Sequence, residues 1–221
     1  MLLDYLWRGR LLINYRQPPP IFECLRHARY YPRLSWEGSV MRMLGLPFEL
    51  SICGLDELAD EIVSFAPSHI VSILDPGEDD GDPLIFDESI RVLRLRFFDI
   101  HAMGGMVGSM LSARDRAEYP CVDHAHAILE FGRNIPSGSK VLIHCWAGVS
   151  RSTAAAFVLA CLHLSPDQAM HLILGLRPGA MPNRLIVRFA DKILGFEGRM
   201  VAAIDGHKQG VDRRSIRSSR R

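Results

Sequence analysis

The chain has 221 residues, of which 48% are hydrophobic and 23% are charged, and its formal net charge is +1. This composition is typical of a globular protein with one sizeable core, and it excludes a disordered or membrane-embedded chain. The longest apolar run, around residues 154–164, is too short to cross a bilayer and contains His163, so no membrane-spanning segment is expected.

The N-terminal sequence MLLDYLWRGRLLINYRQPPP places Asp4, Arg8 and Arg10 among its first apolar residues. A secretory signal needs an uninterrupted apolar stretch followed by small residues, so no such signal is expected. The five cysteines are widely spaced and form neither CxxC pairs nor a dense disulfide framework. We therefore expect a reducing, cytoplasmic location.

Charge is distributed unevenly along the chain, with basic ends on either side of an acidic body. Residues 1–45 contain QPPP and show no sustained hydrophobic period, which predicts a poorly structured extension with at most local helix. Residues 201–221 form a basic tail with too little apolar content to fold alone. Short charged ends are more often solvated segments than nucleic-acid sites, so no nucleic-acid partner is expected. Residues 46–200 are the predicted folded domain.

Strand and helix patterns alternate through this domain. Short apolar or alternating runs predict strands at residues 46–53, 69–75, 90–100 and 139–145. Helical patterns cover residues 54–66, 121–135, 151–164, 167–176 and 182–196. Ser165 and Pro166 have the residue types of an N-cap and of a first helical position. This order predicts an α/β fold with a central, mostly parallel sheet flanked by helices.

The stretch VLIHCWAGVSRSTAAAF, residues 141–157, places Cys145 between an apolar strand and a helix. The first turn of a helix has N–H groups without partners, and the helix dipole favours an anion in front of them. Gly148 lets the backbone come close to such an anion, and Arg151 adds a planar fork for two of its oxygens. The same positive potential favours a thiolate at Cys145, aimed at a bound phosphate.

The amides expected to hold the phosphate come from the residues between the cysteine and the arginine, namely Trp146, Ala147, Gly148, Val149 and Ser150. A second possibility for Ser150 is that it caps the helix. Ser152 is expected to donate a hydrogen bond to the sulfur and to make it a better leaving group. The chemistry predicted is metal-independent phosphoester hydrolysis through a phosphocysteine intermediate, without a cofactor.

The motif HCWAGVSRS resembles the signature loop of the cysteine-dependent protein tyrosine and dual-specificity phosphatases. The resemblance covers residues 46 to about 200 and is closest to small bacterial tyrosine-phosphatase-like proteins, which end in a segment similar to RPGAMPNRLIVRFAD. It implies that His144 orients the cysteine and that Asn183 helps to hold the loop. It also implies a phosphorylated protein as partner, with phosphotyrosine as substrate and phosphoserine or phosphothreonine left open. The oligomeric state is not indicated.

The leaving group needs a proton, and the resemblance implies an aspartate on a loop after a strand. Asp99 ends the strand pattern VLRLRFFDI and is the preferred candidate, with a loop insertion at residues 101–110. Asp115 is the alternative, because it is closer to Cys145 in sequence but has no strand before it. Asp123 is assigned to the first turn of the next helix, where a carboxylate suits the dipole.

Other readings of the same residues remain. Cys145 alone is typical of a buried structural cysteine. A phosphatase fold that binds phosphoproteins without turnover, a sulfur-transfer or arsenate-reducing enzyme, and a phosphatase for a non-protein monoester are the functional alternatives. The positions between Cys145 and Arg151 contain no lysine, which disfavours inositol lipids as substrates.

Overall fold

The computed structural model describes residues 6–7, 10–11, 45–77, 86–101 and 118–206. The chain divides into two units, residues 1–34 and 35–221, and each is described by itself. In the first unit, β1 (Leu6–Trp7) and β2 (Arg10–Leu11) form an antiparallel pair. The predicted boundaries after residues 45 and 200 stay predictions.

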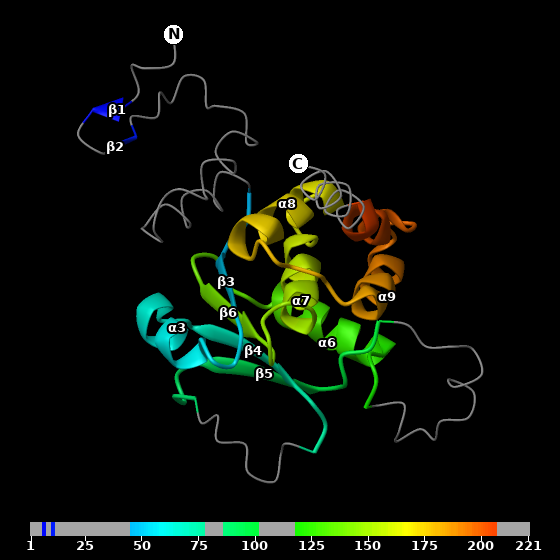
Figure 1. Ribbon diagram of the computed structural model, residues 1–221, viewed down its shortest axis with the longest axis horizontal. Helices are drawn as coiled ribbons and strands as arrows, with labels where there is room; N and C mark the ends of the chain where they lie inside the picture. Colours follow the sequence, from blue (N-terminus) through cyan, green and yellow to red (C-terminus); the bar gives the residue numbers. More distant parts are fainter. Residues whose placement is uncertain (1–5, 8–9, 12–44, 78–85, 102–117, 207–221) are drawn as a thin grey trace, which may run out of the picture. The chain divides into compact units, whose positions relative to one another are not determined.

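The second unit contains a four-stranded sheet in which all strands run parallel, in the order β3-β6-β4-β5 (Figure 1). Its strands are β3 (Glu49–Cys53), β4 (His69–Leu74), β5 (Arg91–Arg96) and β6 (Lys140–His144). The predicted α/β fold with a central parallel sheet is therefore confirmed. Because the strands are parallel, their carboxyl ends meet at one edge of the sheet, which is where ligands bind in open α/β sheets.

The apolar sequence of β6 follows from its position between β3 and β4. Val141 and Ile143 belong to one buried cluster, whereas Leu142 belongs to a second cluster on the other face. A strand that is covered on both faces has no position for a polar side chain, so it reads as an uninterrupted hydrophobic run. Because β6 is packed on both faces, its last residue His144 is held in place, and with it the following residue, Cys145.

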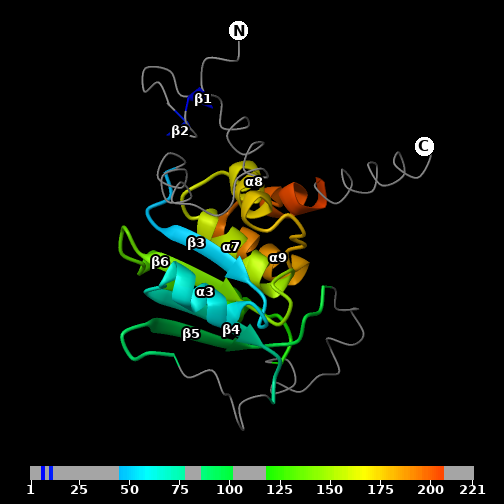
Figure 2. The ribbon, with the colours of Figure 1, turned by 60° about the vertical axis from the view of Figure 1, so that its left-hand side comes forward.

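Helices cover both faces of the sheet (Figure 2). On one face lies α3 (Leu58–Phe65), whose Leu58 is buried with Leu142. On the other lie α6 (Val122–Arg133), α7 (Arg151–Ala160), α8 (Pro166–Leu176) and α9 (Arg184–Leu194). All ten residues of α7 are buried, which explains why residues 154–160 are apolar on every side of the helix. Residues 199–206 are also helical, and Met200 and Ile204 are buried in the core.

The start of α8 agrees with its predicted capping residue. Ser165 is the N-cap of α8, forms a capping box with Gln168, and precedes Pro166 in the first turn. Asn183 caps α9 by accepting hydrogen bonds from the N–H groups of Leu185 and Ile186. Within the part of the chain that is described, no helix is long and apolar enough to span a bilayer.

Candidate active site

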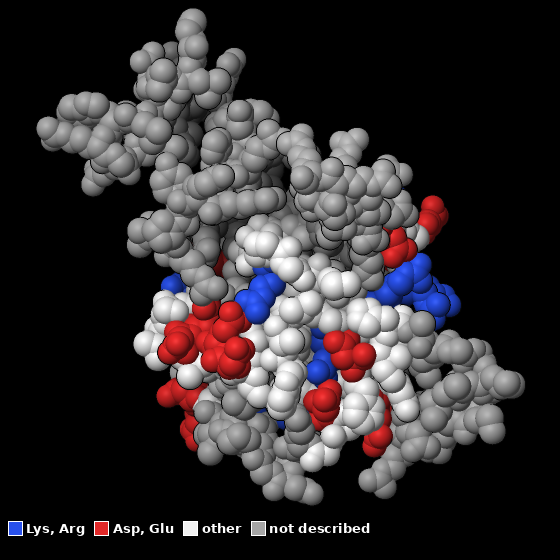
Figure 3. All heavy atoms as spheres, in the orientation of Figure 1, with Lys and Arg blue, Asp and Glu red and all other residues white. Residues whose placement is uncertain are grey.

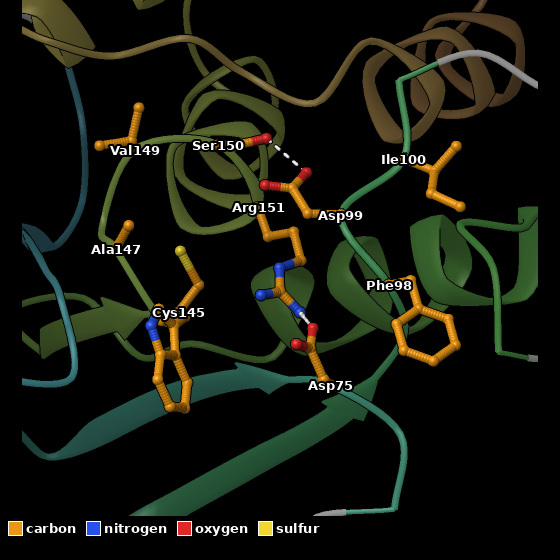
Figure 4. Close-up of a pocket in the computed structure, with 10 residues that line it drawn as sticks. Asp75, Phe98, Asp99, Ile100, Cys145, Ala147, Val149, Ser150 and Arg151 are labelled. Atoms are coloured by element: carbon orange, nitrogen blue, oxygen red, sulfur yellow. Dashed lines mark hydrogen bonds and ion pairs between the residues drawn. The ribbon is translucent and has the colours of Figure 1, made fainter.

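A pocket of about 520 Å³ opens at the carboxyl edge of the sheet (Figure 4). Its walls are formed by Asp75, Phe98, Asp99, Ile100, Cys145, Trp146, Ala147, Val149, Ser150 and Arg151. Cys145 follows β6 directly and is only 2% exposed, while Arg151 is the first residue of α7. The loop between them, residues 145–151, is named the phosphate loop after the anion that the sequence predicts for it.

Gly148 lets the phosphate loop pack directly against the end of β3. Its φ is +69°, and a Cβ atom at this position would lie 2.6 Å from the carbonyl carbon of Cys53 and 2.6 Å from the N of Gly54. Both atoms belong to the backbone and have little freedom to move. Only glycine fits here, because any other residue would add both a left-handed strain and a steric clash.

The carbonyl groups of the phosphate loop are turned toward the surrounding protein. The Leu55 N–H donates to Trp146 O, the Met181 N–H donates to Val149 O, and the Asn183 N–H donates to Ser150 O. Thr153 Oγ1 also donates to the last two of these carbonyls. In the described part of the chain, no hydrogen bond of this loop uses an N–H of residues 146–150. These amides are therefore available to an anion in the pocket.

The sulfur of Cys145 lies 3.1 Å from Ser152 Oγ, on the first turn of α7. Both groups are buried. A hydroxyl at this distance can stabilise a thiolate by donating a hydrogen bond to it, which is the relationship that the sequence predicted for Ser152. His144, the preceding residue, is fully buried, and its ring centroid lies 6.2 Å from that of Phe86.

The guanidinium of Arg151 is held at one end by two acceptors. Its Nη1 donates to Asp75 Oδ1 at 2.6 Å and to the carbonyl oxygen of Phe97 at 2.8 Å. The side chain is 4% exposed, and Nε is buried without a hydrogen-bond partner among the described residues. A buried donor of this kind is costly unless a ligand satisfies it, which points to an anion at this position.

Asp99 lies on the opposite wall of the pocket, and its contacts link it to the phosphate loop (Figure 4). Its Oδ1 accepts a hydrogen bond of 2.6 Å from Ser150 Oγ and one of 2.9 Å from Asn183 Nδ2. Asn183 Nδ2 also donates to the carbonyl oxygen of Ile100, and His101 Nε2 lies 3.1 Å from Ser150 Oγ. The contacts of Asp99 among the described residues all end on Oδ1, so none of these residues competes for Oδ2.

An ion pair supports the phosphate loop from outside. Arg177 Nη1 lies 2.7 Å from Glu57 Oε2, and Arg177 Nη2 donates to the carbonyl oxygen of Ala147. Glu57 Oε2 also accepts from the N–H of Gly54, next to the point where Gly148 packs. The hydrogen bond to Glu57 raises the pKa of Arg177 above its ordinary value. Glu57 and Arg177 thus connect the loop to the end of β3.

Two other buried thiols, Cys53 and Cys161, have raised pKa values, whereas a nucleophilic cysteine must be deprotonated. Burial, reinforced by the charges of Glu61 and Glu57, raises the pKa of the Cys53 thiol to about 12. Burial also raises the pKa of Cys161, with Asp191 as a smaller cause. Both groups remain protonated at neutral pH, so neither is suited to act as a nucleophile.

The structure brings together most of the residues singled out in the sequence. Cys145, Arg151, Asp99 and the intervening loop residues meet at one pocket, with Asn183 bonded to Asp99. Asp123 lies in the first turn of α6. Asp115 and the expected insertion at residues 102–110 lie outside the described residues.

The sequence did not single out Asp75, Glu57 or Arg177. A signal existed for Asp75, because it directly follows β4, a buried strand beside β6, and the carboxyl ends of parallel strands share one edge. Glu57 and Arg177 are 120 residues apart, and no local pattern links them.

The chain matches no protein-family model. It is 33% identical over 97 residues to MAP kinase phosphatase with leucine-rich repeats protein 3 of Dictyostelium discoideum, a stretch of 42% of this chain. The match spans 11% of that relative's length.

Three solved structures are also similar. The Yvh1 phosphatase domain from Chaetomium thermophilum is 19% identical, with a TM-score of 0.44 over 70% of this chain and 94% of that one. Human DUSP28 is 19% identical, with a TM-score of 0.40 over 65% and 89% of the two chains. PTPMT1 in complex with PI(5)P is 14% identical, with a TM-score of 0.43 over 66% and 91%.

The matched proteins are phosphatases. The curated relative confirms the resemblance to this class that the sequence indicated, whereas it does not support a special closeness to the small bacterial members. The solved structures are less than 25% identical to this chain and have TM-scores below 0.5. The function therefore rests on the geometry of the site itself.

Proposed function

We propose that this chain is a metal-independent phosphatase of the cysteine-dependent tyrosine and dual-specificity superfamily, acting on phosphotyrosine. The observation that carries the proposal is the pocket itself. In it, a buried cysteine lies beneath a loop whose carbonyl groups are turned away. Beside it are an aspartate and an arginine whose Nε has no partner among the described residues. Each of these groups has a task in transferring a phosphoryl group.

In the first step, the Cys145 thiolate attacks phosphorus as the bond to the ester oxygen breaks. The amides of residues 146–150 and the guanidinium of Arg151 stabilise the charge on the three equatorial oxygens. Asp99 donates a proton to the leaving oxygen, and Oδ2 is the suitable atom because Ser150 and Asn183 already occupy Oδ1.

In the second step, water attacks the phosphocysteine, the S–P bond breaks, and inorganic phosphate is released. Asp99, now ionised, accepts the proton of the attacking water. The sulfur leaves as a thiolate, which the hydroxyl of Ser152 stabilises from 3.1 Å. The cycle consumes one water molecule and returns both Cys145 and Asp99 to their starting states.

The walls of the pocket favour a phosphate monoester with an aromatic body. Trp146 is 57% exposed and Phe98 is 37% exposed, although both side chains are large and apolar. Among the described residues that line the pocket, Arg151 is the only basic one, and acidic side chains gather over α3 nearby (Figure 3). An aryl ring is stabilised by packing against the apolar walls. A substrate with several phosphates would find no second basic side chain among the described lining residues, and the nearby carboxylates would repel it.

One assay tests the proposal. The protein should hydrolyse para-nitrophenyl phosphate in EDTA, and Cys145→Ser should abolish the reaction. No hydrolysis by the wild type between acidic and neutral pH would refute it in favour of a binding module. Among substrates, a phosphotyrosyl peptide should be preferred over the matched phosphoseryl peptide. A higher kcat/KM for PI(5)P, the ligand seen with PTPMT1, would instead favour a non-protein monoester.

A further inference from the structure

Asp75 forms a wall of the pocket but has no part in the chemistry described so far. It follows β4 immediately, and β4 lies beside β6, the strand that carries Cys145. Its side chain is 40% exposed and lines the pocket. A carboxylate in a site for a dianion is unfavourable unless it has a specific task, because the two charges repel each other.

The task is indicated by the contact with Arg151. Both acceptors of Arg151 Nη1, Asp75 Oδ1 and the Phe97 carbonyl oxygen, come from segments that follow neighbouring strands. They fix the outer nitrogen of the guanidinium from the side of the sheet. Figure 4 shows the guanidinium between Asp75 and Cys145, with the contact to Asp75 at one end. The buried Nε has no hydrogen-bond partner among the residues that the structure describes.

We propose that Asp75 is a positioning residue for Arg151: it fixes one end of the guanidinium so that the remaining N–H groups face two phosphate oxygens. The inference rests on the proposed phosphatase function. An arginine has several flexible torsions, and a bidentate contact requires its planar fork in one orientation. Fixing that orientation before the substrate binds lowers the cost of reaching the transition state.

Asp75 is less suited than Asp99 to be the proton donor. An acid must carry a proton before it can give one away, and protonating Asp75 would replace a charge-assisted contact of 2.6 Å with Arg151 by a weaker neutral one. Among the described residues, Asp99 has no cationic contact of this length: its close donors are a hydroxyl and an amide, and His101 Nε2 lies 3.6 Å from its Oδ1. The two aspartates of the pocket therefore have different roles: Asp75 positions Arg151, and Asp99 donates the proton.

The sign of the effect on anion binding distinguishes positioning from simple repulsion. If Asp75 only repelled the substrate, its removal would strengthen the binding of a phosphate-like anion. If it positions Arg151, its removal weakens binding, and most strongly for an anion that resembles the transition state. Orthovanadate is such a probe, because it adopts a five-coordinate geometry with three equatorial oxygens.

The experiment compares wild type with Asp75→Ala, Asp75→Asn and the surface control Asp60→Ala. We expect Asp75→Ala to lower kcat for para-nitrophenyl phosphate by about tenfold or more and to reduce the thermal protection given by orthovanadate. Asp75→Asn should keep part of the kcat and part of the vanadate protection, because its amide oxygen still accepts a hydrogen bond from Arg151 Nη1. In an Arg151→Lys background, Asp75→Ala should reduce vanadate protection no further, since the fork that it positions is gone.

Three results would overturn the inference. The first is wild-type kcat and vanadate protection in Asp75→Ala. The second is tighter vanadate binding in that variant, which would mean repulsion. The third is loss of a limb of the pH–rate profile with vanadate protection unchanged, which would make Asp75 the acid. Vanadate protection needs no turnover, so an inactive wild type would refute the phosphatase function while this readout still tests the contact between Asp75 and Arg151.

Discussion

Ser150 and Asp99 are 51 residues apart in sequence, yet Ser150 Oγ donates a hydrogen bond of 2.6 Å to Asp99 Oδ1. Asn183, the N-cap of α9, donates to the same oxygen at 2.9 Å. Three segments of the chain, the phosphate loop, the segment after β5 and the start of α9, therefore meet at one carboxylate. The contact orients Asp99 toward the pocket without using the oxygen that would carry a proton.

The first prediction concerns the acid. Asp99→Asn should lower kcat for phenyl phosphate by about 10²- to 10⁴-fold, because the phenoxide then leaves without a proton. The loss should be smaller for para-nitrophenyl phosphate, whose leaving group is a weaker base. Inhibition by inorganic phosphate should stay close to wild type, since Arg151 and the loop amides are intact.

The dependence on the leaving group is the decisive measurement. Equal losses on both substrates would contradict an acid role for Asp99 and leave it a structural contact of Ser150 and Asn183. The matched control is Asp123→Asn, in the first turn of α6, which should retain full activity on both substrates. Full activity in Asp99→Asn together with loss in Asp115→Asn would transfer the role to Asp115.

The sequence was sufficient for the phosphate loop because strand, loop and helix are continuous there. An apolar strand ending at His144, a glycine at position 148 and a buried helix from Arg151 each have a local pattern. The alternation of strands and helices likewise predicted a parallel sheet. Its strand order, with β6 inserted between β3 and β4, has no signal in a single sequence.

The partners of the loop were not predicted, because they are contacts between residues that are distant in sequence. The family resemblance implied that Asn183 helps to hold the phosphate loop, and its backbone N–H does donate to Ser150 O. The side chain of Asn183, however, donates to Asp99 and to the carbonyl oxygen of Ile100. These hydrogen-bond partners depend on which distant segments pack against one another, and the hydrophobic pattern of the sequence does not indicate that packing.

The second prediction concerns Gly148. Gly148→Ala should lower the thermal unfolding midpoint and abolish measurable turnover, because the new Cβ would lie 2.6 Å from backbone atoms of Cys53 and Gly54. The matched control is Gly138→Ala, where φ is +82° and nothing lies within 4 Å. It should cost only the left-handed strain of about 1–2 kcal/mol and keep wild-type kcat. Equal behaviour of the two variants would show that the close approach at Gly148 is not required.

The third prediction concerns the external support of the loop. Arg177→Ala should lower kcat/KM by roughly three- to tenfold, because the carbonyl of Ala147 loses a donor and the loop loses its link to Glu57. The pair is partly exposed, so its contribution to folding should be about 1 kcal/mol or less. Arg177→Lys should not restore activity fully, since an ammonium cannot span Glu57 and Ala147 with one planar fork.

A double-mutant cycle on kcat/KM checks this coupling. Glu57→Gln alone should have a small effect, and combining it with Arg177→Ala should cost less than the sum of the two single changes. Strictly additive effects would mean that Arg177 acts on the loop without Glu57.

The last prediction concerns stability at acidic pH. His124 on α6 accepts a hydrogen bond from the Cys121 N–H through Nδ1, and its ring lies 4.5 Å from that of Phe97. Burial lowers the pKa of His124 below its ordinary 6.5. The unfolded chain therefore takes up this proton before the folded one does, so the free energy of unfolding falls as pH decreases below about 6.5.

Urea unfolding between pH 7.5 and pH 5 measures this slope. His124→Gln keeps an acceptor for the Cys121 N–H, as in a capping box, but removes the titrating ring. It should therefore reduce the slope by up to about 1.4 kcal/mol per pH unit.

Part of the slope should remain, because burial also lowers the pKa values of His69 and His163. The matched control is His126→Gln, exposed on the same helix. An unchanged slope in His124→Gln would mean that its ring is not the group that takes up the proton. Because Phe97 O holds Arg151, loosening of the His124–Phe97 contact at low pH should also lower kcat before the fold is lost.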